Sequence, residues 1–172
     1  MKKFWTVLMC AAMTLSMAAC GSDSASAKND DKIYVGTEAG FAPYEYMSGD
    51  QVVGVDMDIA QAIADALGKE LVIKNMDFDG ALNAVQQGQV DFVAAGVSVD
   101  EERQKVMDFS HNYVDSSDVV IVNASADTVK TNEDIADKIV GVQQGNIADI
   151  WMTNNYPDAQ VKRYTKFVQA AE

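Results

Sequence analysis

Short apolar runs alternate along the chain with stretches in which apolar residues recur every three or four positions. The recurrence is clearest where Ile59, Ile63 and Leu67 fall on one face of a helix that Gly68 is placed to end. The apolar runs are short and rich in β-branched residues, as in strands buried in a sheet. The pattern predicts a strand at 33–35, a helix at 56–67, a strand at 71–73, a helix capped by Asp79 that ends at Gly88, and a strand at 90–95.

The same alternation resumes in the second half of the chain. The pattern predicts a strand at 118–123, a strand at 139–142, a helix near 148–154, a strand at 160–164 and a helix that begins at Phe167. Helices between consecutive strands serve as crossover connections, which favour a parallel sheet covered by helices on both faces. The chain is therefore predicted to be an α/β protein with mostly parallel sheets.

The strand predicted at 118–123 divides the chain in two. We expect it to cross from a first α/β lobe over 32–121 into a second α/β lobe over 122–172. The second lobe is short, because the given sequence ends within the helix that begins at Phe167. Without a following strand, the apolar face of that helix would be poorly covered. We therefore expect the second lobe to be incomplete.

The first 31 residues follow a different pattern. Two lysines precede an apolar stretch over 4–17, and two alanines then lead to Cys20. This order is typical of a secretory signal peptide, and the apolar stretch is shorter than the roughly 20 residues of a transmembrane helix. We expect residues 1–19 to be a signal peptide and residues 20–31, which are small and polar, to be a flexible linker.

The segment Met17-Ala18-Ala19-Cys20-Gly21 resembles the lipobox at which a bacterial signal peptidase cuts before a lipid-modified cysteine. The resemblance implies that Cys20 carries lipid and holds the protein on the cell surface or the periplasmic face of the membrane. Cys10, the other cysteine, would leave with the signal peptide. The mature protein would then have no thiol for a disulfide, a metal site or a nucleophile.

Charge narrows the choice of partners. The chain has 26 acidic and 13 basic residues and a formal charge of −13. Such a surface repels phosphate groups, which disfavours nucleic acid and electrostatic binding to anionic membranes.

Several possible chemical motifs do not meet the requirements of their chemistry. Gly49–Gly54 has the glycine spacing of a phosphate loop but lacks the following Lys and Ser or Thr. His111 is the one histidine, so a His-rich metal site or two-histidine catalysis is excluded. The alternating acids of 56–58 and 77–79 cannot face each other, and we expect them to cap helices or face water. The sequence thus predicts no catalytic residue, metal site or cofactor.

Eight short segments occur in an order that is distinctive as a set. They are Gly36–Glu38, Phe41–Glu45, Gly54–Asp58, Asp77–Asp79, Gly88–Phe92, Gly96–Arg103, Asp108–Ser110 with Tyr113, and Gly141–Gly145. Together they resemble family 3 of the bacterial extracellular solute-binding proteins, which capture polar amino acids. The resemblance implies a type II periplasmic-binding-protein-like fold, closure of two lobes on the ligand, a monomer, and delivery to the permease subunits of an ABC importer.

Arg103 is the strongest candidate ligand residue. A free amino acid offers a carboxylate, and the guanidinium fork of Arg103 can donate two parallel hydrogen bonds to it. The Ser98 N–H can donate to the same group, and a helix predicted to start near Asp100 would present its positive end. The alternative is a weak surface pair of Arg103 with Glu101, Glu102 or another surface acid, but the resemblance favours the ligand role.

The resemblance implies further ligand positions. Phe41 and Phe78 align with positions that flank the ligand side chain, with ordinary core packing as the alternative for Phe78. Glu38 aligns with a position that reaches the far end of the ligand in some relatives, with a solvated loop acid as the alternative. The remaining positions implied are Gly96, Ser98, Gly145 and Asn146.

Capture of a polar amino acid for import is the leading hypothesis, and two others stay open. The family fold also hosts a cyclohexadienyl-dehydratase-like branch, although no evident acid and base pair supports an enzyme here. A ligand-sensing domain or a truncated, nonfunctional product is the third hypothesis. It arises because the family's partner for the ligand ammonium would lie beyond Glu172.

Overall fold

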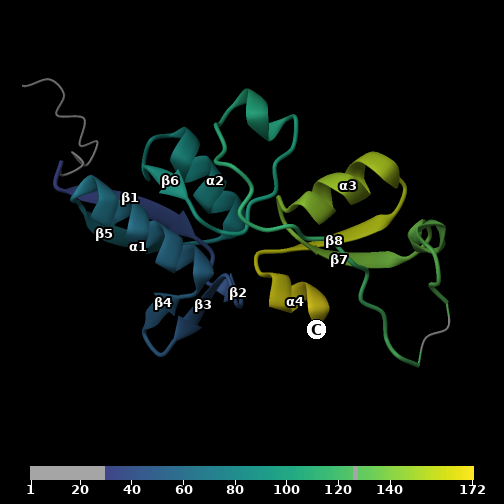
Figure 1. The fold of residues 1–172 in the computed structure, drawn as a ribbon. Helices are drawn as coiled ribbons and strands as arrows, with labels where there is room; N and C mark the ends of the chain where they lie inside the picture. The colour runs from purple at the N-terminus through teal and green to yellow at the C-terminus, as the bar shows by residue number, and fades with distance from the viewer. Residues whose placement is uncertain (1–29, 126–127) are drawn as a thin grey trace, which may run out of the picture.

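The computed structural model describes residues 30–125 and 128–172. Its strands and helices form two groups, which lie side by side in Figure 1. We call the group of strands β1–β6 with helices α1 and α2 the first lobe. The group of strands β7 and β8 with helices α3 and α4 is the second lobe.

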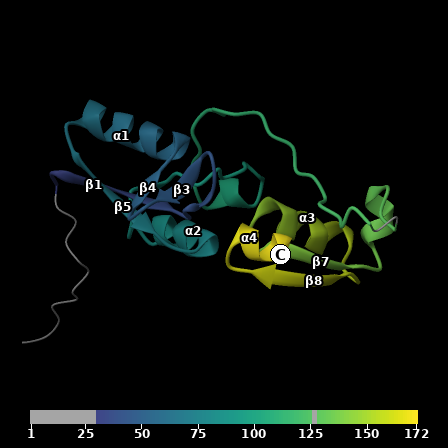
Figure 2. The same ribbon diagram turned by 90° about the horizontal axis from the view of Figure 1, so that it is seen from below.

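A three-stranded parallel sheet forms the centre of the first lobe. β1 (Lys32–Thr37) lies between β5 (Glu70–Asn75) and β6 (Phe92–Val93). The helices α1 (Val55–Leu67) and α2 (Phe78–Gln86) connect these strands and lie on opposite sides of them in Figure 2. The predicted parallel sheet with helices on both faces is confirmed for this lobe.

Between β1 and α1, the chain forms an antiparallel sheet that was not predicted from the sequence. It consists of β2 (Gly40–Phe41), β3 (Glu45–Ser48) and β4 (Gln51–Val53) in that order. Gly54 then turns the chain into α1 at φ 128°, where an added Cβ would lie 2.2 Å from the Tyr44 carbonyl oxygen. Only glycine fits this close approach.

The second lobe repeats the parallel arrangement on a smaller scale. β7 (Ile139–Gln143) pairs in parallel with β8 (Gln160–Tyr164) through α3 (Ile147–Asn155), and α4 (Phe167–Ala171) follows. A 3₁₀ helix, η2 (Asn132–Ile135), precedes β7 and contributes Ile135 to a core with Val142 and Met152. The elements predicted near 139–142, 148–154 and 160–164 are confirmed.

The apolar face predicted for α1, with Ile59, Ile63 and Leu67, is not the face that the helix buries. Ile63 and Leu67 are 37% and 57% exposed, whereas Asp56, Ala60 and Ala64 are each 0% exposed. The buried stripe therefore carries an acid and small residues, and the larger apolar side chains remain outside. Exposed apolar residues are common on protein surfaces, so the size of a side chain alone did not identify the face.

Four predicted elements also differ in their bounds or their type. The N-cap of α2 is Asp77 and not Asp79, and the strand expected at 90–95 shrinks to β6. The helix expected near Asp100 is a single 3₁₀ turn, η1 (Arg103–Lys105). Residues 118–123 run without strand pairing among the described residues, with Val119 80% exposed. An apolar run becomes a strand only where a neighbouring strand supplies hydrogen bonds.

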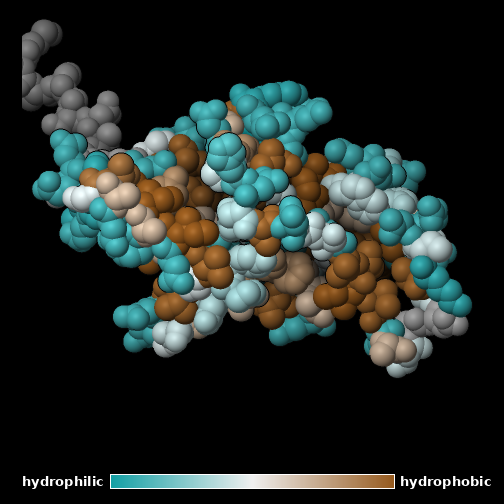
Figure 3. Space-filling view, in the orientation of Figure 1, coloured by the Kyte–Doolittle hydropathy of each residue, from teal (hydrophilic) through white to brown (hydrophobic). Residues whose placement is uncertain are grey.

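The described residues add three further observations. Figure 3 shows patches of apolar surface on both lobes. Among residues 30–125 and 128–172, no helix combines the length and apolarity that crossing a membrane requires. In the same ranges, no group of three or more His, Cys, Asp or Glu side chains is placed to hold a metal ion.

Candidate ligand-binding site

The predicted lipid attachment at Cys20, the signal peptide at 1–19 and most of the linker at 20–31 lie outside the described residues. The eight predicted ligand residues all lie within them. They are distributed over both lobes and the turn η1.

Arg103 connects the two lobes. It begins the turn η1 and is 6% exposed. Its Nη1 donates to the Ser98 carbonyl oxygen at 2.6 Å, and its Nη2 donates to the Gly145 carbonyl oxygen of the second lobe at 2.7 Å. Ser98 thus contacts Arg103 through its carbonyl group. Of the acids in the alternative interpretation, Glu101 and Glu102 do not pair with Arg103, whereas the neighbouring Asp100 does, and both side chains of that pair are largely buried.

Asp100 both caps the turn and pairs with the guanidinium. Its Oδ1 accepts from the backbone N–H groups of Glu102 and Arg103 at 2.9 and 3.1 Å. Its Oδ2 forms an ion pair with Arg103 Nε at 3.2 Å. Burial lowers the pKa of Arg103, and the negative charge of Asp100 opposes that change. Asp100 therefore compensates part of the cost of burying a cation.

Arg103 retains capacity for another acceptor. A guanidinium carries five N–H groups, one on Nε and two on each terminal nitrogen. Ser98 accepts one N–H from Nη1 and Gly145 accepts one from Nη2, while Asp100 Oδ2 lies beside Nε as an ion pair without a hydrogen bond. These two hydrogen bonds leave a second N–H on each terminal nitrogen.

Glu38 lies at the contact between the lobes, and its interpretation as a solvated loop acid is wrong. It is 3% exposed, and its Oε2 accepts from Nε2 of Gln143 in β7 at 3.1 Å. Burial raises the pKa of Glu38, while the Gln143 hydrogen bond and the positive charge of Lys166 oppose that rise. A cation beside Glu38 would favour its ionised form.

Gln143 is a site residue that the sequence analysis missed. Its Nε2 also donates to the Thr165 carbonyl oxygen at 3.3 Å, and its Oε1 accepts from Nδ2 of Asn146 at 3.1 Å. Asn146, predicted to bind the ligand, is the N-cap of α3. The sequence signal was available, because a polar residue ending an otherwise apolar strand often lies at the carboxyl edge of a sheet, where ligands bind.

Two aromatic groups lie near these contacts. Phe41 in β2 stacks on Tyr44 with ring centroids 5.5 Å apart, and it meets Phe167 of α4 edge to face at 5.9 Å. Gly96, at φ 55°, lies against Phe41, because an added Cβ would approach that ring to 3.2 Å. Phe41 and Gly96 are therefore neighbours, as their shared ligand role would require.

Phe78 combines two environments. It is 4% exposed and packs in the first-lobe core with Leu82 and Ala95. The Arg103 guanidinium also lies 5.7 Å from the centroid of its ring. Phe78 is thus a core residue that supports the candidate carboxylate-binding group through a cation–π contact.

Gly145 meets the first lobe directly. It adopts φ 74°, and an added Cβ would lie 2.9 Å from Asp79 Oδ1. Its N–H donates to Asp149 Oδ2 at 3.1 Å, and Asp149 also accepts from Arg163 Nε at 2.9 Å. Glycine is favoured here both by the left-handed backbone and by the close approach of the lobes.

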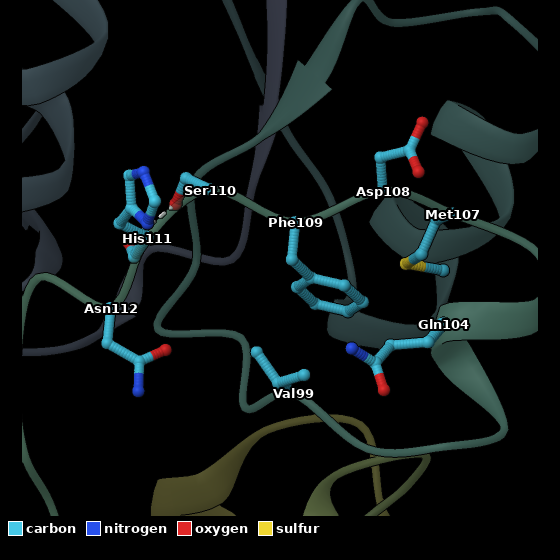
Figure 4. A pocket seen from close by; sticks show the side chains of 8 residues that line it. All are labelled: Val99, Gln104, Met107, Asp108, Phe109, Ser110, His111 and Asn112. Carbon is cyan, nitrogen blue, oxygen red and sulfur yellow. Dashed lines mark hydrogen bonds between the residues drawn. The ribbon is translucent and has the colours of Figure 1, made fainter.

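The structure brings Arg103, Ser98, Gly145 and Phe78 together, and it places Glu38 beside Gln143 and Asn146. A pocket of about 590 Å³ lies elsewhere, and none of the eight predicted residues lines it. Figure 4 shows its lining, in which the Phe109 ring points toward Val99 and Gln104. The lining residues are Val99, Gln104, Met107, Asp108, Phe109, Ser110, His111 and Asn112.

A buried acid cluster beside Gly96 also escaped prediction. Asp56 was expected to cap a helix or to face water, but the N-cap of α1 is Gly54 and Asp56 is 0% exposed. Its Oδ2 accepts from the Gly96 N–H at 2.8 Å, and the Tyr113 hydroxyl donates to its two oxygens at 3.0 and 3.1 Å. Glu45, at the start of β3, is 1% exposed and lies near Asp56. Burial, followed by the Asp56 charge, raises the pKa of Glu45 to about 9 and also raises that of Tyr113.

Comparison with known proteins identifies relatives for this arrangement. The arginine-binding extracellular protein ArtP of Bacillus subtilis is 37% identical over 150 residues, which are 87% of this chain and 58% of ArtP. A probable histidine-binding protein of Campylobacter jejuni is 29% identical over 87% of this chain and 60% of its own length. The chain therefore spans about 60% of these curated relatives.

Solved structures give the same result. Arginine-bound ArgBP from T. maritima superimposes with a TM-score of 0.77 at 37% identity, over 82% of this chain and 67% of that one. The ancestral amino acid-binding protein AncCDT-1, a precursor of cyclohexadienyl dehydratase, has a TM-score of 0.75 at 29% identity, over 82% of this chain and 64% of that one. The expected type II periplasmic-binding-protein-like α/β fold is confirmed.

The family assignment rests on a match over most of the chain. Residues 33–166 match the family described as bacterial extracellular solute-binding proteins, family 3. That range contains the sheets of both lobes and all eight predicted ligand residues. The chain belongs to the bacterial extracellular solute-binding proteins of family 3.

Proposed function

We propose that this chain captures a polar amino acid between its two lobes, as the extracytoplasmic substrate-binding component of an ABC importer. The observation that carries the proposal is the buried guanidinium of Arg103, which contacts both lobes. The remaining N–H groups on Nη1 and Nη2 would hold the ligand carboxylate. Closure of the lobes on the ligand would then couple binding to a change of shape.

The proposed ligand has a cationic side chain. Glu38 is a buried carboxyl group whose burial raises its pKa, so a cation beside it would relieve the cost of ionisation. Phe41 and Phe78 would flank the aliphatic part of the side chain. Relatives named for binding arginine and histidine support this choice.

The remaining assignments complete the proposal. A signal peptide at 1–19 would direct export and be removed, and lipid on Cys20 with a linker at 20–31 would then hold lobes at 32–121 and 122–172 outside the membrane. Gly96, Ser98, Gly145 and Asn146 would contribute main-chain or amide contacts to the ligand. The chain would act as a monomer and deliver the ligand to permease subunits in the membrane.

Titration calorimetry of the purified chain with separate amino acids tests this function. L-arginine, L-lysine and L-histidine should release or absorb heat and bind more tightly than L-glutamine, while L-glutamate should bind weakly because it would meet Glu38. No heat with any member of this panel, together with no rise in melting temperature, would overturn the proposal.

An enzymatic function has less support. The family and its curated relatives are named as binding proteins. The structural relative AncCDT-1 is itself named as an amino acid-binding protein, although it is described as a precursor of a dehydratase. Incubation with a cyclic carboxylate substrate and detection of its dehydrated product would distinguish this alternative from reversible binding.

A further inference from the structure

Two buried carboxyl groups lie near each other in the first lobe, next to the candidate ligand residue Gly96. Glu45 at the start of β3 is 1% exposed, and Asp56 in the first turn of α1 is 0% exposed. Asp56 is close enough to raise the pKa of Glu45, and Glu45 Oε2 is buried without a hydrogen-bond partner. Two adjacent carboxylates cannot both remain ionised without water, so one proton must stay with the pair.

The partners of Asp56 indicate where that proton resides. Asp56 accepts from the Gly96 N–H and from the Tyr113 hydroxyl, so both of its oxygens already act as acceptors. No hydrogen bond from a donor to the Glu45 carboxyl group is found among the described residues. The titratable groups near Glu45 are Asp56 of α1, Glu38 after β1 and the Tyr113 hydroxyl. The proton accordingly belongs on Glu45.

The groups held by Asp56 belong to the parts of the chain that shape the site. Gly96 follows β6 and lies against the ring of Phe41. Tyr113 lies on the extended segment between η1 and η2, which connects the two lobes (Figure 1). One carboxylate therefore fixes both a candidate ligand residue and the connection between the lobes.

We propose that the Glu45–Asp56 pair is a positioning element of the ligand site, in which a proton shared by two buried carboxyl groups holds Gly96 and the Tyr113 segment in the binding geometry. The proposal rests on the proposed function, because Gly96 matters to the ligand only if the site binds one. Loss of the proton would place two negative charges side by side, and the contacts of Asp56 with Gly96 and Tyr113 would loosen.

The proposal predicts that ligand affinity falls at alkaline pH. The pKa of Glu45 is raised to about 9, so the proton is retained at neutral pH and lost between about pH 8 and 10. One pH unit above the pKa, about a tenth of the molecules keep the proton, and the apparent affinity falls about tenfold if only those molecules bind.

Calorimetry with L-arginine from pH 7 to pH 10 on the wild type and Glu45→Gln tests this prediction. Gln stays neutral and can still donate to Asp56, so the variant should match the wild type near pH 7 and keep more of its affinity at pH 10. Titration of the ligand ammonium affects both proteins equally and cancels in the comparison. Parallel pH profiles for the two proteins would overturn the proposal.

Two further variants locate the effect. Asp56→Asn presents an amide N–H₂ toward groups that are themselves donors, so it should weaken L-arginine binding at least tenfold across the pH range. Asp58→Asn is the matched control, because Asp58 lies in the same helical turn and is exposed. Should Asp56→Asn not fold, Tyr113→Phe removes a single donor and should weaken binding by a smaller factor. Wild-type affinity in both Asp56→Asn and Tyr113→Phe would contradict the positioning role.

A readout without ligand separates this inference from the proposed function. NMR can follow the Glu45 carboxyl carbon and the Gly96 amide proton through the same pH range. The Gly96 amide signal should move with the titration of Glu45, and this movement should vanish in Glu45→Gln. If Glu45 titrates near its ordinary value, or Gly96 does not respond, the positioning role is refuted even where L-arginine binds. If both respond but no amino acid binds, the proposed function alone fails.

Discussion

Glu45→Gln should stabilise the folded chain by an amount that grows as the pH rises. Glu45 is 1% exposed, and burial and Asp56 raise its pKa from 4.5 to about 9. Gln has nearly the same shape, remains neutral, and can donate to Asp56 in place of the carboxyl proton. The variant therefore removes the titration.

The size of the effect follows from proton linkage. Below pH 4.5 both the folded and the unfolded chain hold the proton, so Glu45 has no pH-dependent cost. Between 4.5 and about 9 the unfolded chain releases the proton and the folded chain keeps it, so the folded state loses about 1.4 kcal/mol per pH unit. The accumulated cost is about 3 kcal/mol at pH 7 and about 6 kcal/mol at pH 9.

Urea denaturation followed by circular dichroism at pH 5, 7 and 8.5 measures this difference. The free energies of unfolding of Glu45→Gln and wild type should diverge steadily with pH. Glu70→Gln is the control, because Glu70 is exposed and forms a surface pair with Lys32 that is worth at most about 1 kcal/mol. A constant offset between Glu45→Gln and wild type at all three pH values would refute the protonated, buried state of Glu45.

Three other changes have defined outcomes. Glu38→Gln should weaken L-arginine binding at least tenfold in calorimetry and leave L-glutamine binding nearly unchanged, because the lost charge faces the ligand side chain; equal losses for both ligands would contradict this. Phe78→Ala should lower the free energy of unfolding by about 3 to 5 kcal/mol in urea denaturation, since it opens a cavity in the first-lobe core. Cys20→Ser should move the protein from the membrane to the soluble fraction on cell fractionation, and an unchanged distribution would exclude lipid on Cys20.

Local signals predicted much of the fold. The strands β1, β7 and β8 were recognisable as short runs between polar turns, although β1 is largely buried and β8 has no buried residue. Gly68 ends α1 in the left-handed conformation, as its position in the pattern indicated. The run at 118–123 had the same composition but forms no strand among the described residues, because pairing depends on a neighbour and not on the run itself.

The candidate site was only partly predictable. Arg103 was identifiable from its chemistry and its motif, whereas its contact with the Gly145 carbonyl joins residues 42 positions apart. Asp56 looked like an ordinary first-turn acid, and its burial became visible only when the helix face turned out to carry Asp56, Ala60 and Ala64. Glu45 gave no sequence signal, because its raised pKa arises from tertiary burial beside another acid.

The most direct test of the binding account is the affinity of Arg103→Lys for L-arginine, measured by calorimetry beside Lys105→Ala. Lysine keeps the charge but not the planar fork, so the account predicts a loss of at least tenfold, or about 1.5 to 3 kcal/mol, with a melting temperature that still shows a folded chain. Lys105, exposed in the same turn, should be replaceable without effect. Wild-type affinity in a folded Arg103→Lys variant would contradict the role of this guanidinium in holding the ligand carboxylate.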